Sequence, residues 1–231
     1  MKLGIIGAMT VEVETLKEQL SNLKVTTRAG MEFYEGVLSD CPVVVVQCGV
    51  GKINAAMCVQ MLCDLFSVTH IVNTGVAGSL CAELDIGDFV ISSDAMYHDF
   101  NVTALGYAVG QVPGLPVLAF PADDGLIHAA MAAAQQVHPD HACIGRIASG
   151  DQFVAGKDQK QQIIADTGAL CTEMEGAAIA HAAWRNGVPF VVIRAISDKA
   201  DDSAEMDYPT FEAIAAKRCA AVTRELAASL V

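Results

Sequence analysis

Short apolar runs rich in β-branched residues recur along the chain, and segments of helical length separate several of them. Runs of this length without a helical period are typical of buried strands. We therefore expect strands at residues 2–6, 43–47, 70–73, 88–92, 143–148 and 190–196. The alternation of strand and helix predicts an α/β fold with a mostly parallel central sheet. Ligands of such sheets bind beyond the carboxyl ends of the strands, where candidate site residues are to be sought.

Two helices have clear boundary signals. The stretch CTEMEGAAIAHAAWRNGVPF ends with Asn-Gly and then Pro189, so a short helix is expected to stop before the strand at 190–196. Pro209 marks the start of a final helix with an apolar face. Its expected members are Phe211, Ile214, Ala215, Val222 and Leu226. The acidic segment 199–207 before it is predicted to be a loop whose position could cover a site.

Composition narrows the class of protein. A chain of 231 residues with 53% hydrophobic content fits a single domain, residues 1–231. No apolar run reaches the roughly 18 residues of a membrane span, and MKLGIIG is too short for a signal-peptide core. Eight scattered cysteines without a Cys-x-x-Cys motif are typical of a reducing compartment. A net charge of −13 argues against nucleic acid. We expect a soluble cytoplasmic protein with a small-molecule partner and no membrane partner.

Two carboxylates follow predicted strands. Glu12 falls in the first turn of a helix that Thr10 is expected to cap, where the helix dipole favours an anion that could act as a base. Asp198 closes VVIRAISD, and partial burial there would raise its pKa so that it could act as an acid. Ordinary alternatives remain: acids are common in first turns, and Asp198 could simply start a loop.

Other candidate residues are ambiguous by spacing alone. Thr172 and Glu175 fit a helix capping box as well as a binding role for the glutamate. Phe153 could stack on a flat ligand or pack in the core. The stretch from Gly49 to Lys52 lacks the flanking residues of a phosphate loop, Gly4-x-x-Gly7 lacks the dinucleotide spacing, and no histidines have metal-ligand spacing.

Six motifs carry a resemblance to a known family. GIIGAM with Glu12 behind it, GVGKINAA, NTGVAGSL, IASGDQFV, TEMEGAAIAH and VIRAISDKAD occur in the order and near the spacing of the bacterial 5'-methylthioadenosine/S-adenosylhomocysteine nucleosidases. The resemblance covers nearly the whole chain. It implies the three-layer α/β/α sandwich of the nucleoside phosphorylase and nucleosidase superfamily, and release of adenine from both nucleosides without a metal or other cofactor.

The resemblance also implies roles for individual residues. Glu12 matches the group that activates the hydrolytic water, and Asp198 matches the acid that protonates N7 of the leaving adenine. Glu175 matches the carboxylate that binds the ribose hydroxyls, with Met174 beside the sugar and the base. This division of labour suits N-glycoside cleavage, which builds positive charge on the sugar and negative charge on the base.

Further matches surround this set. Phe153 is expected to stack on the purine while the backbone of Val154 holds its edge. Ser197 and Arg194 match groups that support Asp198 and the ribose end, and Gly78 matches a position near the substrate.

The remaining matches concern the 5' end of the substrate and a second subunit. Met9, Val50 and Tyr208 match the lining of the sugar and alkylthio side. Leu105 and Pro113 match residues that reach in from the neighbouring subunit of a homodimer.

The chain departs from the family pattern at two positions, and two rival functions remain. Val76 stands where relatives carry Ser, and Ser79 replaces a glycine, so the geometry of the ribose and water site could differ. A phosphorylase would need cations for phosphate, and Glu12 would repel that anion. A catalytically silent nucleoside sensor would need neither an acid nor a base. We therefore expect a hydrolase.

Overall fold

The computed structural model describes residues 1–231, except the side chains of Glu205 and Met206. Its strands are β1 (Leu3–Gly7), β2 (Ser21–Arg28), β3 (Met31–Leu38), β4 (Cys41–Gln47), β5 (His70–Ser79), β6 (Phe89–Tyr97), β7 (Phe120–Pro121), β8 (Ala142–Ser149), β9 (Cys171–Glu173) and β10 (Phe190–Asp198). Its helices are α1 (Thr10–Glu18), α2 (Lys52–Phe66), α3 (Asp124–Val137), α4 (Lys157–Thr167), α5 (Gly176–Asn186) and α6 (Ala204–Ser229), with a 3₁₀ turn η1 (Thr103–Leu105).

All ten strands join one mixed sheet in the order β10-β6-β8-β9-β5-β1-β4-β3-β2, with β7 paired to β6. β10 pairs with β5 as well as with β6, and the strands β4, β1, β5 and β10 therefore form a continuous parallel run. That second pairing closes β5, β9, β8, β6 and β10 into a ring. The carboxyl ends of β1, β5 and β10 therefore meet at one edge of the sheet, where a ligand site is expected.

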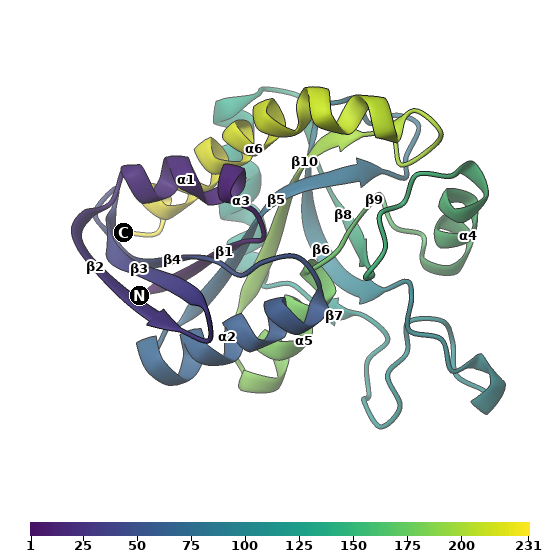
Figure 1. Ribbon diagram of the computed structural model, residues 1–231, viewed down its shortest axis with the longest axis horizontal. Coiled ribbons are helices and arrows are strands. Elements are labelled where there is room, and N and C mark those ends of the chain that lie inside the picture. The colour runs from purple at the N-terminus through teal and green to yellow at the C-terminus, as the bar shows by residue number, and fades with distance from the viewer.

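Helices cover both faces of the sheet, which confirms the predicted three-layer α/β/α sandwich. Helices α1, α3 and α6 bury an apolar cluster on one face, and α2 and α5 bury a second cluster on the other. Figure 1 shows α1 and α6 above the sheet and α2 and α5 below it, with α4 at one side.

The six predicted strands are all present, and every one except β1 is longer than predicted. β5 continues to Ser79 and β10 to Asp198, so both reach into the edge described above. Four strands were missed. Most of β2 is exposed and its sequence SNLKVTTR is largely polar, while β7 and β9 have two and three residues. None of these three has an apolar run long enough to indicate a strand.

The predicted loop at 199–207 is wrong in its second half, because α6 begins at Ala204 and Pro209 lies inside the helix. The cause is local hydrogen bonding that composition does not reveal. The Ser203 hydroxyl donates to the Asp207 carboxylate at 2.8 Å, and the Asp207 N–H donates to the Ser203 carbonyl at 3.0 Å. The predicted apolar face of α6 is also wrong at one position, since Ile214 is exposed.

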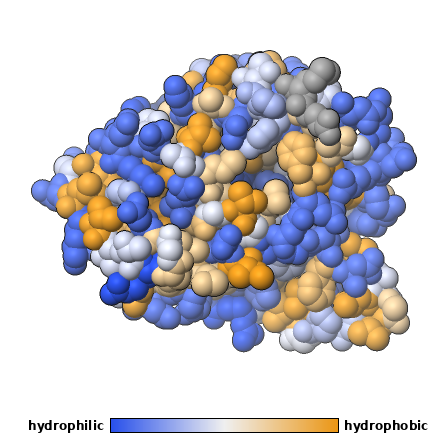
Figure 2. Space-filling view, viewed as in Figure 1, coloured by the Kyte–Doolittle hydropathy of each residue, from blue (hydrophilic) through white to orange (hydrophobic). Residues whose placement is uncertain are grey.

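The face seen in Figure 2 is predominantly hydrophilic, with apolar side chains gathered at its centre and on the segment between β6 and β7, which projects from the body of the molecule (Figures 1 and 2). Across the residues that the structure describes, no helix combines the length and apolar character that crossing a bilayer requires. The eight cysteines are free thiols, and five of them are buried.

Candidate active site

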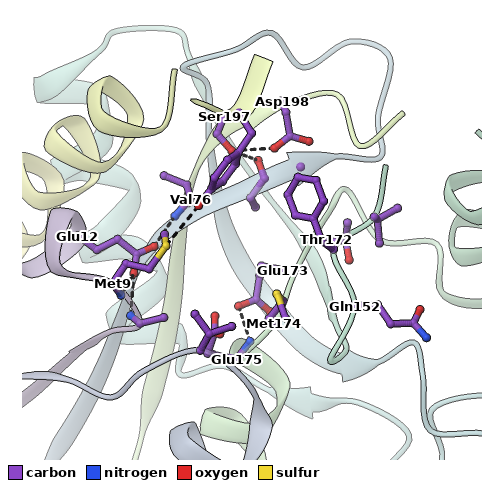
Figure 3. Close-up of a pocket in the computed structure, with 17 residues that line it drawn as sticks. Met9, Glu12, Val76, Gln152, Thr172, Glu173, Met174, Glu175, Ser197 and Asp198 are labelled. Carbon is purple, nitrogen blue, oxygen red and sulfur yellow. Dashed lines mark hydrogen bonds between the residues drawn. The ribbon is translucent and has the colours of Figure 1, made fainter. Parts of the chain in front are cut away.

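A pocket opens where β1, β5, β9 and β10 end. Its walls come from the start of α1, the ends of β5 and β10, the β9–α5 junction and the segment 152–154. It encloses about 600 Å³, part of it open to solvent, which suits a small-molecule ligand. In Figure 3, Glu12 and Asp198 approach the cavity from different sides, and Glu175 and Met174 lie on a third.

Twelve of the fifteen residues predicted for the site line this pocket. They are Met9, Glu12, Val50, Val76, Gly78, Phe153, Val154, Met174, Glu175, Ser197, Asp198 and Tyr208. Arg194 lies behind the wall and is 1% exposed. Leu105 and Pro113 lie elsewhere, on the projecting segment between β6 and β7.

Glu12 is buried at the N-terminus of α1, and its carboxylate accepts three backbone hydrogen bonds. Oε2 accepts from the N–H groups of Ala8 at 2.7 Å and Met9 at 3.0 Å, and Oε1 accepts from Val76 at 3.1 Å. Burial raises the pKa of Glu12, and Arg194 together with these N–H groups opposes the rise. The expected cap was wrong by one residue: Met9 precedes the helix, and the Thr10 hydroxyl donates to Gln47 instead.

Asp198 lies at the end of β10, beyond an irregularity in its pairing with β5 that re-aims the side chain. Oδ2 accepts from the Ser197 hydroxyl at 2.9 Å and Oδ1 from the Ala200 N–H at 2.8 Å. Gly78 makes room for it, since a Cβ there would lie 2.8 Å from Oδ1. Burial raises the pKa of Asp198, although both hydrogen bonds oppose the rise. The carboxyl group can therefore hold a proton at higher pH than an exposed aspartate.

Glu175 is also buried, and its carboxylate points away from its own helix. Oε1 accepts from the N–H of Gly51 at 2.8 Å, the residue that precedes α2. Burial and the neighbouring Glu173 carboxylate raise the pKa of Glu175 to about 7, with Arg194 opposing. The alternative of a capping box is wrong, because Thr172 belongs to β9 and Glu175 makes no capping hydrogen bond.

Glu173 performs the capping that was expected of its neighbours. Its carboxylate accepts from the N–H of Glu175 at 3.0 Å and of Gly176 at 2.8 and 2.9 Å, and from the Ser149 hydroxyl. It also forms a buried ion pair with Arg194. Sequence alone assigns no chemistry to Glu173 and leaves it at the edge of a pocket or on the surface. The structure places it in the wall of the pocket, where it is 8% exposed.

Arg194 connects the carboxylates of the site. Besides Glu173, its guanidinium lies 3.9 Å from Oε1 of Glu12 and 3.9 Å from Oε2 of Glu175, and it donates to Oδ1 of Asn73 at 2.6 Å. Gly75 of the paired strand permits this approach, because a Cβ there would overlap both the guanidinium and the Glu12 carboxylate. Burial lowers the pKa of Arg194, but the three carboxylates outweigh burial and the net pKa rises.

Apolar side chains complete the walls. The Phe153 ring is half exposed and meets Tyr208 edge-on with 5.4 Å between centroids, so the alternative of a core aromatic is wrong. The Tyr208 hydroxyl lies 3.3 Å from the sulfur of Met9. Val154 is buried. A flat apolar ligand can therefore be enclosed between aromatic and aliphatic surfaces.

Five lining residues were not predicted. They are Ala8, Ala77, Gln152, Thr172 and Glu173. Four of them adjoin a predicted residue in sequence, and Thr172 lies two residues before Met174; this proximity is the signal that could have found them. In the described part of the chain, no group of three His, Cys, Asp or Glu side chains is placed to hold a metal ion.

Comparisons with known proteins agree with this geometry. The family described as Phosphorylase superfamily matches residues 2–228. A 5'-methylthioadenosine/S-adenosylhomocysteine nucleosidase of Staphylococcus aureus (strain MRSA252) is 44% identical over 210 residues, which span 90% of this chain and 91% of the relative.

Two solved structures are similar over their whole length. The nucleosidase of Neisseria meningitidis in complex with methylthio-immucillin-A has a TM-score of 0.95 and 38% identity, covering 99% of each chain. That of Colwellia psychrerythraea 34H in complex with adenine has a TM-score of 0.95 and 40% identity, covering 100% of this chain and 96% of the other.

The raised pKa of Glu175 predicts a pH-dependent effect on stability. A carboxyl group whose pKa rises from 4.5 to about 7 on folding stabilises below pH 4.5 and loses that contribution as the pH rises to 7. Glu175→Gln removes the titration. We expect the free energy of unfolding of the variant, relative to the native protein, to increase by on the order of 2–3 kcal/mol between pH 5 and pH 8.

Urea unfolding at both pH values measures this difference, with the exposed Glu14→Gln on α1 as the matched control. The control is expected to differ from the native protein by the same small amount at both pH values. A Glu175→Gln difference as flat as that of the control would contradict the prediction.

Proposed function

The chain belongs to the phosphorylase superfamily and to its 5'-methylthioadenosine/S-adenosylhomocysteine nucleosidase family, and on this premise we propose that it hydrolyses the N-glycosidic bond of both nucleosides to release adenine. Water supplies the hydroxyl group that replaces the base at C1'. The other product is the 5-alkylthio sugar, and no cofactor takes part.

The observation that carries hydrolysis over phosphorolysis is the absence of a cation facing the cavity. Among the described residues that line the pocket there is no Lys or Arg. Arg194, the buried guanidinium behind the wall, is already surrounded by three carboxylates. Phosphate would enter a site with Glu12 and Glu175 at its edge and no opposite charge to hold it, which is unfavourable at low dielectric. Water is neutral, so its entry into the same site meets no such electrostatic repulsion.

Asp198 is the proposed acid. As the C1'–N9 bond breaks, its proton passes to N7 of adenine, so the base leaves neutral. Burial raises the pKa of Asp198 and supports the protonated state that this step requires. Hydrogen bonds from the Ser197 hydroxyl and the Ala200 N–H orient the carboxyl group.

Glu12 is the proposed base, and Glu175 the proposed ribose clamp. Three backbone N–H groups fix the position of the Glu12 carboxylate. The carboxylate can therefore take a proton from the water that attacks C1' without changing its own position. Glu175 would accept from the two ribose hydroxyls with Met174 beside the ring. Its charge would then lie near the positive charge that develops on the sugar.

Leu105 and Pro113 suggest a second subunit. Both are exposed, Leu105 to 72%, and their segment projects from the body of the molecule (Figure 1). Apolar side chains are visible on this projection (Figure 2). We propose that in a homodimer this segment covers the 5' end of the partner's pocket, with Leu105 and Pro113 against the alkylthio group.

The products of the reaction separate a hydrolase from a phosphorylase and from a silent binder. Purified protein incubated with 5'-methylthioadenosine in phosphate-free buffer is expected to release adenine and the free sugar, because the pocket offers water but no phosphate site. Chromatography identifies the products. Formation of a sugar 1-phosphate, or turnover only with phosphate, would contradict hydrolysis, and binding without turnover would indicate a sensor.

Two substitutions test the proposed acid and the proposed base. Asp198→Asn and Glu12→Gln are each expected to lower kcat by at least about 10² to 10⁴, the usual contribution of a general acid or base. Asp202→Asn and Glu14→Gln, on the surface of the neighbouring segments, are the matched controls. A near-native kcat in either site variant removes that residue from the mechanism.

A substitution on the projecting segment tests the proposed homodimer. Leu105→Asp is expected to shift the protein from dimer to monomer in sedimentation and to raise KM for 5'-methylthioadenosine, because a charge would replace an apolar contact with the partner. Leu23→Asp on β2, also an exposed leucine, is the control. A native protein that sediments as a monomer would contradict the proposed homodimer.

A further inference from the structure

An ionic cluster of Lys52, Asp99 and Asp151 lies beside the pocket without lining it. The Lys52 ammonium is 2.6 Å from Oδ2 of Asp99 and 3.8 Å from Oδ2 of Asp151. The same Oδ2 of Asp99 accepts from the N–H of Asp151 at 2.9 Å, and Oδ1 of Asp151 accepts from the N–H of Lys52 at 2.9 Å. The three residues therefore form a closed set of contacts, which we call the Lys52 cluster.

The Lys52 cluster joins two segments that are about 100 residues apart in sequence and meet at the pocket. On one side, Gly51 precedes Lys52, and its N–H holds Oε1 of Glu175. On the other side, Asp151 precedes the lining residues Gln152, Phe153 and Val154. A shift of either segment against the other would move the Glu175 carboxylate relative to the Phe153 ring.

Close packing leaves the two segments little freedom where they meet. Gly51 has a φ of +97°, and a Cβ there would lie 3.1 Å from Oδ1 of Asp151. A Cβ on Gly150 would overlap His98 and approach the Asp99 carboxyl carbon to 2.9 Å. Residues 151–156 belong to no helix or strand, so no ladder of backbone hydrogen bonds fixes them. Their position depends on side-chain contacts such as those of the cluster.

Charge makes the lysine essential to the cluster. The side chain of Asp99 is 11% exposed, and it shares its cation with a second carboxylate. Without that cation, two like charges would face each other at a partly buried site, and the less buried Asp151, with its side chain 50% exposed, is the one free to move outward. Its movement would carry Phe153 with it.

We propose that Lys52 is a positioning residue for base recognition: its ammonium holds Asp99 and Asp151 together and thereby sets the Gly51–Glu175 contact and the Phe153–Val154 wall at the separation that a purine nucleoside needs. The identity of the ligand rests on the proposed function. The cluster touches no reacting atom, so its contribution is to affinity and alignment.

Kinetics and adenine binding test this role. For Lys52→Met we expect KM and the dissociation constant of adenine, measured by calorimetry, to rise about tenfold or more, while kcat falls far less than the roughly 10² or more expected of Asp198→Asn and Glu12→Gln, because misplacement weakens binding and leaves both of those groups intact. Lys52→Arg keeps the charge and is expected to recover most of the affinity. Asp151→Ala, at a side chain that is 50% exposed, is expected to raise the same two constants.

Lys2→Met is the matched control, since Lys2 forms a comparable ion pair with Glu35 at 2.5 Å, far from the pocket. It is expected to change the melting temperature as Lys52→Met does, with native KM and adenine affinity. If Lys52→Met and Asp151→Ala both bind adenine within twofold of the native protein, the cluster is only structural and the proposal is overturned. If the native protein neither releases nor binds adenine, the proposed function itself fails.

Discussion

The guanidinium of Arg194 is the charge on which the site depends. It is almost wholly buried among carboxylates from α1, from β9 and from the first residue before α5. Buried charges persist only when they are paired, and removing one partner of such a pair costs about 3–5 kcal/mol. Arg194 therefore requires Glu173 for folding, and in return it holds Glu12 and Glu175 near one another. Gly75 of the paired strand permits this arrangement, because a side chain there would overlap both Arg194 and Glu12.

One cation does not neutralise three carboxylates, and this imbalance has a chemical consequence. Glu173 forms the direct ion pair, whereas Glu12 and Glu175 are both 3.9 Å from the guanidinium. The remaining negative charge contributes to the raised pKa of Glu175. A substrate that develops positive charge on its sugar would supply the missing counter-charge in the transition state, so the interaction strengthens as the bond breaks. Interactions of that kind accelerate a reaction, whereas uniform binding does not.

The sequence predicted the parts of the site that depend on local order. Glu12 and Asp198 could be located because each follows a buried strand, and the carboxyl ends of adjacent parallel strands share an edge. Glu173 could not be recognised, because its partner Arg194 lies 21 residues further on and its capping of α5 is visible only in three dimensions. The pattern Thr172-x-x-Glu175 suggested a cap by spacing, but pairing of Thr172 with Ala148 and Gly78 placed it in a strand. The role of Glu173 and the strand conformation of Thr172 both depend on contacts with residues distant in sequence.

Val76 and Ser79, where the sequence was expected to depart from the family pattern, leave the contacts of Glu12, Asp198 and Glu175 in place. Val76 holds Oε1 of Glu12 through its backbone N–H, a bond that any non-proline side chain at this position retains. Its own side chain lines the cavity with an isopropyl group. Ser79 makes a local turn instead, donating to the Cys81 carbonyl at 2.7 Å and accepting from the Cys81 N–H at 3.2 Å. The side chain at position 76 therefore sets the polarity of one wall, which acts on ligand affinity more than on the position of the Glu12 carboxylate.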